Sequence, residues 1–191
     1  MISPRHIPNI ISALRIASAP VLIGLTWLGW QQAFSWLLAA ALVSDILDGA
    51  IARRFGYVSD FGSLLDSVAD FLLFVVSAYG IWRFYPDLVA EHEYAFLLVV
   101  VLWIGTSVAG YLRYGRMASF HTYLARVTAY VIGGFLATLF LLGFYPWLFW
   151  TAVTLVVLAN VEEFILMALL PTWTPNARGL YWVLKRREGQ A

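Results

Sequence analysis

The sequence contains no cysteine in its 191 residues. This absence excludes a disulfide framework, a thiolate zinc site and a thiol redox centre. Charged residues are also scarce at 12%, whereas 62% of the residues are hydrophobic and the mean hydropathy is +0.79. A soluble domain of this size cannot bury so much apolar surface, so the composition excludes an ordinary water-soluble protein and indicates an integral membrane protein.

Apolar runs long enough to cross the hydrocarbon core, about 20 residues each, account for most of the chain. They predict six transmembrane helices, at residues 8–29, 32–54, 60–82, 94–114, 120–143 and 146–170. Arg15 interrupts the first run, which we nevertheless expect to be a membrane span and not a cleaved signal. The joining segments are too short for another domain, and no linker or internal repeat is visible. We therefore expect an all-α integral membrane protein, a six-transmembrane-helix bundle that forms one domain over residues 1–191.

Basic residues are distributed unevenly about these spans. Nine of the 12 Lys and Arg residues fall at the chain ends or in the second and fourth connections, namely Arg5, Arg53, Arg54, Arg113, Arg116, Arg178, Lys185, Arg186 and Arg187. Because basic residues concentrate on the cytoplasmic side, both termini and the second connection are expected to face the cytoplasm. A basic side also suits contact with anionic headgroups. We expect a multi-pass protein of the cell (cytoplasmic) membrane, with membrane lipids and no nucleic acid as partners.

Five aspartates gather between the second and third apolar runs. At about 100° per residue, Asp45 and Asp48 share one face of the second predicted helix, and Asp66 and Asp70 share one face of the third. The two faces can meet across a short turn. Four carboxylates brought together in a low-dielectric site cannot all ionise unless cations lie between them. An all-oxygen set of ligands suits hard ions such as Mg²⁺ or Mn²⁺.

Small residues accompany the acids on these helix faces. Gly49, Ala52 and Gly62 lack the bulk that would keep a substrate away from the helix backbone. Arg53 adds a planar guanidinium fork that suits a phosphate. The stretch thus combines ligands for hard metal ions with room for a phosphate-bearing ligand.

Written as a pattern, the stretch reads Asp45-x2-Asp48-Gly49-x2-Ala52-Arg53-x8-Gly62-x3-Asp66-x3-Asp70. It resembles, at every fixed position, the signature of the CDP-alcohol phosphotransferase (CDP-alcohol phosphatidyltransferase) family. The resemblance implies a membrane transferase of phospholipid biosynthesis that moves a phosphatidyl group from CDP-diacylglycerol to an alcohol and releases CMP.

The resemblance also implies roles for the residues of the pattern. Two Mg²⁺ or Mn²⁺ ions would be bound by Asp45, Asp48, Asp66 and Asp70. Asp70 would in addition be the general base toward the acceptor hydroxyl. The CDP-binding pocket would be formed by Gly49, Ala52, Arg53 and Gly62. A homodimer with one active site per subunit is the assembly that the resemblance implies. Small residues on which helices can approach closely occur in the third and fourth spans, at Ser77, Ala78, Gly80, Gly105, Ala109 and Gly110, and these residues can equally pack within one bundle.

Other interpretations of the acids exist. Intramembrane aspartates also occur in ion pathways and proton-coupled transporters, so a carboxylate-gated membrane transporter is the alternative outside the family. Asp60 lies outside the pattern, and its place at the start of the third span indicates a helix-capping or first-turn role. The Trp, Tyr and Phe residues are expected at span ends and on lipid-facing surfaces, as in an interfacial aromatic belt.

The sequence gives less information about the acceptor alcohol than about the donor and the metal ligands. Arg113, Arg116 and Arg126 lie near the cytoplasmic ends of the fourth and fifth predicted spans. Arg113 and Arg126 are either a clamp for a phosphate on the acceptor or ordinary positive-inside charge. His121 is expected to be a hydrogen-bonding interface residue. Glycerol 3-phosphate is the leading acceptor, and inositol phosphate is an alternative of the same chemistry.

Two acids in the last span indicate a different acceptor class. Glu162 and Glu163 lie about two turns inside that span, and neighbours in sequence cannot share a helix face, so at least one should point into the bundle. It either neutralises Arg126, Arg113 or Arg15, or meets a cationic acceptor. Serine, choline and ethanolamine therefore remain alternative acceptors.

Overall fold

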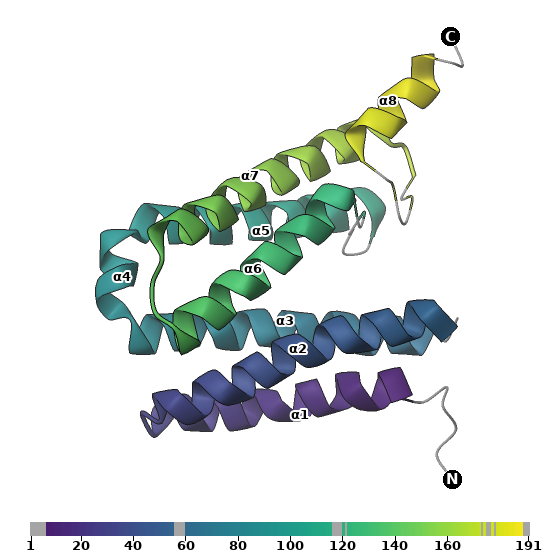
Figure 1. Ribbon diagram of the computed structural model, residues 1–191. Helices are drawn as coiled ribbons and strands as arrows, with labels where there is room; N and C mark the ends of the chain where they lie inside the picture. The colour runs from purple at the N-terminus through teal and green to yellow at the C-terminus, as the bar shows by residue number, and fades with distance from the viewer. Residues whose placement is uncertain are drawn as a thin grey trace. The chain divides into compact units, whose positions relative to one another are not determined.

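The computed structural model describes residues 7–55, 60–115, 120, 122–172, 174, 177 and 179–188, without the side chains of 7–8, 46–55, 60–61, 63–64, 67 and 186–188. Every regular element in these ranges is an α-helix (Figure 1). The helices are α1 (Ile7–Trp27), α2 (Gln31–Phe55), α3 (Asp60–Phe84), α4 (Pro86–Glu91), α5 (Glu93–Tyr114), α6 (Tyr123–Leu141), α7 (Pro146–Leu169) and α8 (Leu180–Glu188). The predicted all-α class is confirmed for the described residues.

Six long helices coincide with the six predicted apolar runs, and no boundary differs by more than three residues. Four helical segments are long and apolar enough to cross a membrane: Asn9–Trp27, Glu93–Tyr114, Tyr123–Leu141 and Pro146–Leu169. α2 and α3 have 25 residues each but also carry the aspartates, which lower their hydropathy. The count of six spans therefore stays a prediction. The short helices α4 and α8 were not expected from the apolar runs.

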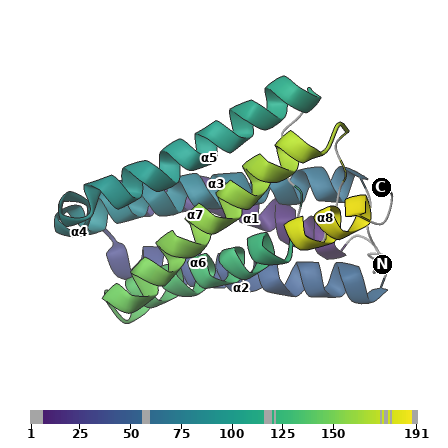
Figure 2. The ribbon, with the colours of Figure 1, turned by 90° about the horizontal axis from the view of Figure 1, so that it is seen from above.

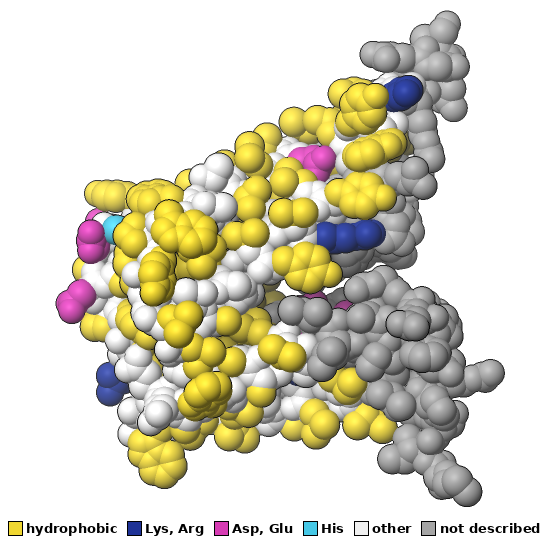
Figure 3. All heavy atoms as spheres, viewed as in Figure 1, with side chains coloured by type: hydrophobic (Ala, Val, Ile, Leu, Met, Phe, Trp, Pro, Cys, Tyr) yellow, Lys and Arg dark blue, Asp and Glu magenta, His cyan; other side chains and the backbone are white. Residues whose placement is uncertain are grey.

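Large apolar side chains are exposed along the long helices, and they cover much of the face seen in Figure 3. Tyr94 and Leu112 are each 80% exposed, and Trp27 is 73% exposed. Water-soluble proteins rarely expose so much contiguous apolar surface, whereas lipid solvates it. Trp27, Tyr94 and Trp147 lie at the ends of α1, α5 and α7, where an interfacial aromatic belt is expected.

The contacts of the chain divide it into two compact units. The first consists of Met1–Glu91 and Leu136–Gly143, and the second of His92–Phe135 and Phe144–Ala191. The first unit contains α1 to α4 and the last turns of α6. The second contains α5, α7, α8 and the rest of α6. The expectation of a single domain over residues 1–191 stays a prediction.

In the first unit, α1 packs against both α2 and α3, and the three helices run alongside one another (Figure 2). The contact face of α1 is a stripe of buried residues spaced three or four apart: Ser12, Arg15, Ala19, Leu22 and Thr26. This spacing follows the helical period, so one side of α1 faces its two neighbours. An arginine therefore occupies a position that packing would ordinarily give to a small or apolar side chain.

Phe34, near the start of α2, packs in the core of this unit. Its side chain is fully buried, and its ring centroid lies 5.4 Å from that of Phe84 and 4.9 Å from that of Phe140. Gly80 of α3 lies directly against the ring, because a Cβ at that position would be 2.4 Å from Phe34 Cζ. The absence of a side chain at Gly80 is thus what allows α3 to pack on Phe34.

Tyr85, between α3 and α4, joins three segments of the same unit. Its hydroxyl donates to the Leu139 carbonyl at 2.8 Å and accepts from Gln31 Nε2 at 3.0 Å. Burial raises the pKa of Tyr85 above its ordinary value, and the hydrogen bond from Gln31 lowers it by less. The phenol therefore remains a donor at neutral pH.

The second unit is held by aromatic packing and by polar pairs between helices. The Phe149 ring centroid lies 5.5 Å from that of Phe96 and 5.7 Å from that of Phe135. Thr106 of α5 donates to Asn160 Oδ1 of α7 at 3.0 Å. Such a pair is favourable in lipid because neither group can turn to water instead.

Most of the small residues named for close helix approach pack inside the two units, whereas Ala78 is exposed. Ser77 is 2% exposed, Gly80 meets Phe34, and Gly110 is also buried. Ala109 packs against the core cluster around Phe120. These contacts match the interpretation that the small residues pack within one bundle.

The contact between Gly80 and Phe34 predicts an asymmetric effect of adding one methyl group. Gly80→Ala should lower the free energy of unfolding by about 1–3 kcal/mol, because the new Cβ overlaps a buried ring. Gly24→Ala is the matched control, since no heavy atom lies within 4 Å of its added Cβ. Thermal unfolding of both purified variants in detergent is the measurement. Equal stability of the two variants would contradict this packing.

Candidate active site

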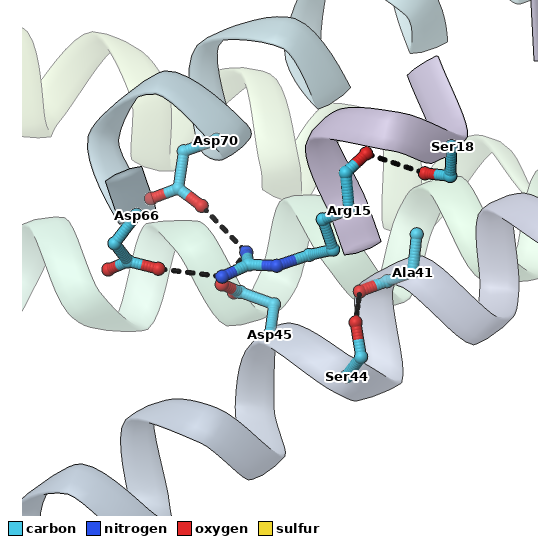
Figure 4. Close-up of polar contacts among 7 residues, drawn as sticks. All are labelled: Arg15, Ser18, Ala41, Ser44, Asp45, Asp66 and Asp70. Carbon is cyan, nitrogen blue, oxygen red and sulfur yellow. Dashed lines mark hydrogen bonds and ion pairs between the residues drawn. The ribbon is translucent and has the colours of Figure 1, made fainter. Parts of the chain in front are cut away.

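Three aspartates from the predicted stretch converge in the first unit (Figure 4). Asp45 comes from α2, and Asp66 and Asp70 come from α3. One carboxylate oxygen of each lies within 4.8 Å of those of the other two. The predicted meeting of the two acidic helix faces is therefore confirmed for these three residues.

The helical period explains why packing brings these carboxylates together. On α2, Phe34, Leu38 and Ala41 form a buried stripe that Asp45 continues by one further turn. On α3, Asp66 and Asp70 flank Ala69, which is 1% exposed, at the start of the face that packs against α1. The acids thus lie at one end of the same faces whose apolar residues hold the three helices together.

Arg15 of α1 lies among the three carboxylates. Its guanidinium donates to Asp66 from Nη2 at 2.6 Å and to Asp70 from Nη1 at 3.0 Å, and Nη1 also bonds Asp45. The arginine side chain is only 2% exposed. From the sequence, Arg15 was expected in the first span, as a candidate partner of Glu162 or Glu163, and not in this site. The signal that identifies it is its place in the buried stripe of α1.

The arrangement fits a divalent cation. The side chains of Asp45, Asp66 and Asp70 are 42%, 48% and 55% exposed, so the carboxylates can be reached from outside the three-helix packing. Three carboxylates lie around one guanidinium, so the cluster has more acidic groups than a single arginine can balance. An oxygen-only ligand set with excess negative charge suits Mg²⁺ or Mn²⁺. The bound guanidinium itself shows that the site accepts a cation.

The other residues of the pattern are only partly within the described structure. The side chains of Asp48, Gly49, Ala52 and Arg53 lie outside the described residues, although the α2 backbone is helical through these positions. Gly62 is partly buried in α3, one turn before Asp66. The roles given to these residues stay predictions. α3 begins at Asp60, as its predicted place in the first turn requires.

Both arginines considered for the acceptor belong to the second unit and are exposed. Arg113 donates from Nη2 to the Leu170 carbonyl at 3.2 Å. The Arg126 guanidinium lies 5.5 Å from the centroid of the Tyr123 ring. Exposed guanidinium groups of this kind keep N–H donors that can bind a phosphate. Arg116 and His121 lie outside the described residues.

Glu162 is hydrogen-bonded to two neutral groups of the second unit. Its carboxylate accepts from Thr122 Oγ1 at 2.7 Å and from the Leu180 amide at 2.9 Å. Thr122 precedes α6, and Leu180 is the first residue of α8, so one carboxylate joins α7 to the starts of two other helices. Glu163 accepts a hydrogen bond from the Phe120 backbone. Among the described residues, Glu162 thus has neutral hydrogen-bond partners, and neither an ion pair with Arg126, Arg113 or Arg15 nor a cationic acceptor is shown for it.

Comparison with known proteins adds an independent line of evidence. The model of the CDP-alcohol phosphatidyltransferase family matches residues 5–171. Over 109 residues, the chain is 38% identical to "Cardiolipin synthase (CMP-forming)" of Streptomyces coelicolor, a match that covers 50% of this chain and 49% of that protein. Over 75 residues, it is 39% identical to "CDP-diacylglycerol--glycerol-3-phosphate 3-phosphatidyltransferase" of Pseudomonas fluorescens, covering 38% of each chain.

A third relative transfers to a different alcohol. The chain is 37% identical over 65 residues to "CDP-diacylglycerol--inositol 3-phosphatidyltransferase" of Saccharomyces cerevisiae, covering 34% of this chain and 29% of that protein. The matches thus span about half or less of the length of these curated relatives. No solved structure matches the chain. The family match over residues 5–171 and the convergence of the acids of its pattern lead to one conclusion: the chain belongs to the CDP-alcohol phosphatidyltransferase family.

Proposed function

We propose that this chain transfers a phosphatidyl group from CDP-diacylglycerol to the hydroxyl of an alcohol, with release of CMP, in phospholipid biosynthesis. The observation that carries the proposal is the convergence of Asp45, Asp66 and Asp70, from two helices, at the spacing of the family pattern. The relatives that act on CDP-diacylglycerol support the choice of donor. The long apolar helices suit a substrate that is itself a membrane lipid.

The aspartates give the reaction its charge environment. Asp45, Asp66 and Asp70, together with Asp48, would hold two Mg²⁺ or Mn²⁺ ions. Such ions, when bound, neutralise the donor diphosphate and the leaving CMP. Arg53 would bind a phosphate oxygen of the donor, and Gly49, Ala52 and Gly62 would let the cytidine nucleotide approach the helix backbones.

Asp70 is the proposed general base. The acceptor oxygen forms a new bond to the phosphorus of the phosphatidyl group, and the bond from that phosphorus to the CMP oxygen breaks. The hydroxyl proton passes to the Asp70 carboxylate and then to solvent. The Asp70 side chain is 55% exposed, so its carboxylate is accessible to an entering hydroxyl.

Glycerol 3-phosphate is the acceptor that we propose first. The Pseudomonas fluorescens relative takes its name from this acceptor, and the exposed guanidinium groups of Arg113 and Arg126 suit its phosphate. Inositol phosphate is the next candidate, since it offers the same phosphate. Glu162 accepts hydrogen bonds from neutral groups, which favours a phosphorylated acceptor over serine, choline or ethanolamine. The Streptomyces coelicolor relative, a cardiolipin synthase that forms CMP, supports the release of CMP in the proposed reaction.

The first test measures CMP release by the purified chain with CDP-diacylglycerol and Mg²⁺. Release should require one acceptor from a panel of glycerol 3-phosphate, inositol phosphate, inositol, serine, choline and ethanolamine. EDTA should abolish it, and Mg²⁺ or Mn²⁺ should restore it. Asp66→Asn should slow it on the order of 10³-fold, because a ligand charge is lost. Asp87→Asn, an exposed acid of α4, is the matched control and should be neutral.

Two outcomes of this test would refute the proposal. An undiminished rate in EDTA would exclude the metal-dependent mechanism. If CMP is not released with any acceptor of the panel, the transferase reaction is excluded and the carboxylate-gated transporter is favoured.

The second prediction separates the base from the metal ligands. Asp70→Asn should abolish turnover and leave most of the affinity for CDP-diacylglycerol, because the amide cannot accept the proton while the other carboxylates remain. Asp45→Asn should weaken donor binding and turnover together. The measurement is donor binding and turnover of both variants at saturating Mg²⁺. Near-normal turnover of Asp70→Asn, or a loss of donor binding as complete as in Asp45→Asn, would remove Asp70 from the role of base.

We also propose a homodimer, as the family resemblance implies. Because most of the small residues on α3 and α5 pack within their own units, we propose that the contact between subunits uses the exposed apolar faces. The mass of the complex in mild detergent and in lipid nanodiscs measures this directly. A monomeric mass in both media would refute the dimer.

The localisation that we propose is the cell membrane, with the site and both termini on the cytoplasmic side. Positive residues at the chain ends and in the second connection support this orientation. The chain has no cysteine, so single cysteines can report sidedness. In intact cells, a membrane-impermeant thiol reagent should label Leu142→Cys and not Lys185→Cys. The reverse pattern would invert the orientation.

A further inference from the structure

Arg15 approaches the acidic cluster from its buried side. The guanidinium is attached to α1, and its side chain is 2% exposed, whereas each carboxylate that it bonds is about half exposed. The arginine and an entering ion therefore reach the same three carboxylates from opposite sides. The bonds from Arg15 to Asp45, Asp66 and Asp70 use Oδ1 of each aspartate, and they hold α1 to both α2 and α3.

A divalent ion and this guanidinium are electrostatic competitors. Both need the negative charge of Asp45, Asp66 and Asp70, and the carboxylate oxygens lie within 4.8 Å of one another, so an ion bound there is close to the guanidinium. Like charges at such a separation repel, and the burial of the guanidinium limits how far water screens this repulsion. In the absence of an ion, the same arginine limits the repulsion among three clustered carboxylates.

We propose that Arg15 is a tethered counter-cation that competes with the divalent ion for the three carboxylates and so sets the metal affinity of the site. The inference rests on the proposed metal-dependent function. In the metal-free protein, Arg15 holds the ligands and the three helices together. On metal binding, the guanidinium gives up part of its bonding to these carboxylates.

The opposite role for Arg15 predicts the opposite result. If the arginine served to hold the carboxylates in the right positions for an ion, its removal would weaken metal binding. If it competes, its removal strengthens metal binding. The sign of the change in metal affinity therefore decides between the two roles, without any measurement of turnover.

The test measures Mn²⁺ binding to the full-length chain in detergent, without substrates, from the electron paramagnetic resonance signal of free Mn²⁺. Arg15→Gln should bind Mn²⁺ at least tenfold more tightly than the wild type. Arg15→Lys keeps the charge and should stay within about threefold of the wild type. Arg83→Gln is the matched control for loss of one exposed arginine, about 20 Å along α3 from Asp70, and should leave the affinity unchanged.

Equal or weaker Mn²⁺ binding by Arg15→Gln would overturn the inference while leaving the proposed function intact. An equal gain in Arg83→Gln would also overturn it, because the effect would then be one of net charge. If the wild type itself and all variants fail to bind Mn²⁺, the proposed metal dependence fails together with the inference. The wild-type result thus distinguishes the two failures.

A second measurement does not depend on the folding of Arg15→Gln. In ¹⁵N-arginine-labelled wild-type protein, Mg²⁺ should shift the guanidinium resonance of Arg15, assigned through Arg15→Lys, and leave that of Arg83 in place. An unmoved Arg15 resonance at Mg²⁺ concentrations that saturate the site by calorimetry would overturn the inference.

Discussion

The ionic cluster of Arg15 with Asp45, Asp66 and Asp70 is the interaction on which the first unit of this protein depends. Charges among apolar helices are tolerated only when they have partners, because the low dielectric penalises each isolated ion. The cluster therefore requires α1, α2 and α3 to keep one relative register. The apolar stripes of the same helices provide that register, and the Gly80–Phe34 contact closes their other end. Packing and chemistry are consequently parts of one arrangement.

The polar residues of the two units have different kinds of partner. In the second unit, Thr106 is paired with Asn160, and Glu162 accepts from Thr122 and the Leu180 amide, so polar groups meet neutral partners and join helices. In the first unit, three acids share one guanidinium and retain an excess of negative charge. A site that is satisfied internally stabilises a fold, whereas a site with unbalanced charge attracts a cation. The proposed binding of metal ions therefore belongs to the first unit.

Much of this organisation follows from sequence alone. Apolar runs located the six long helices because length and hydropathy depend on local composition. Helical periodicity predicted that Asp45 meets Asp66 and Asp70, because the 3.6-residue repeat fixes which positions share a helix face. The role of Arg15 could not be predicted from periodicity, because its partners lie 30 to 55 residues away and only tertiary packing brings them together. The hydrogen bonds of Glu162 were not predicted for the same reason. Helix α8 was not predicted because its nine residues give little periodic signal.

We propose that Asp45, Asp66 and Asp70 form a cation site at which Arg15 competes with a divalent ion. Anomalous diffraction from crystals of the full chain grown with Mn²⁺ can locate the ion. We expect an anomalous peak within direct coordination distance of carboxylate oxygens of Asp45, Asp66 and Asp70, with Arg15 bonded to fewer of these carboxylates than in the metal-free protein. Mn²⁺ bound elsewhere in the chain, or at the aspartates with all three Arg15 bonds unchanged, would contradict the account.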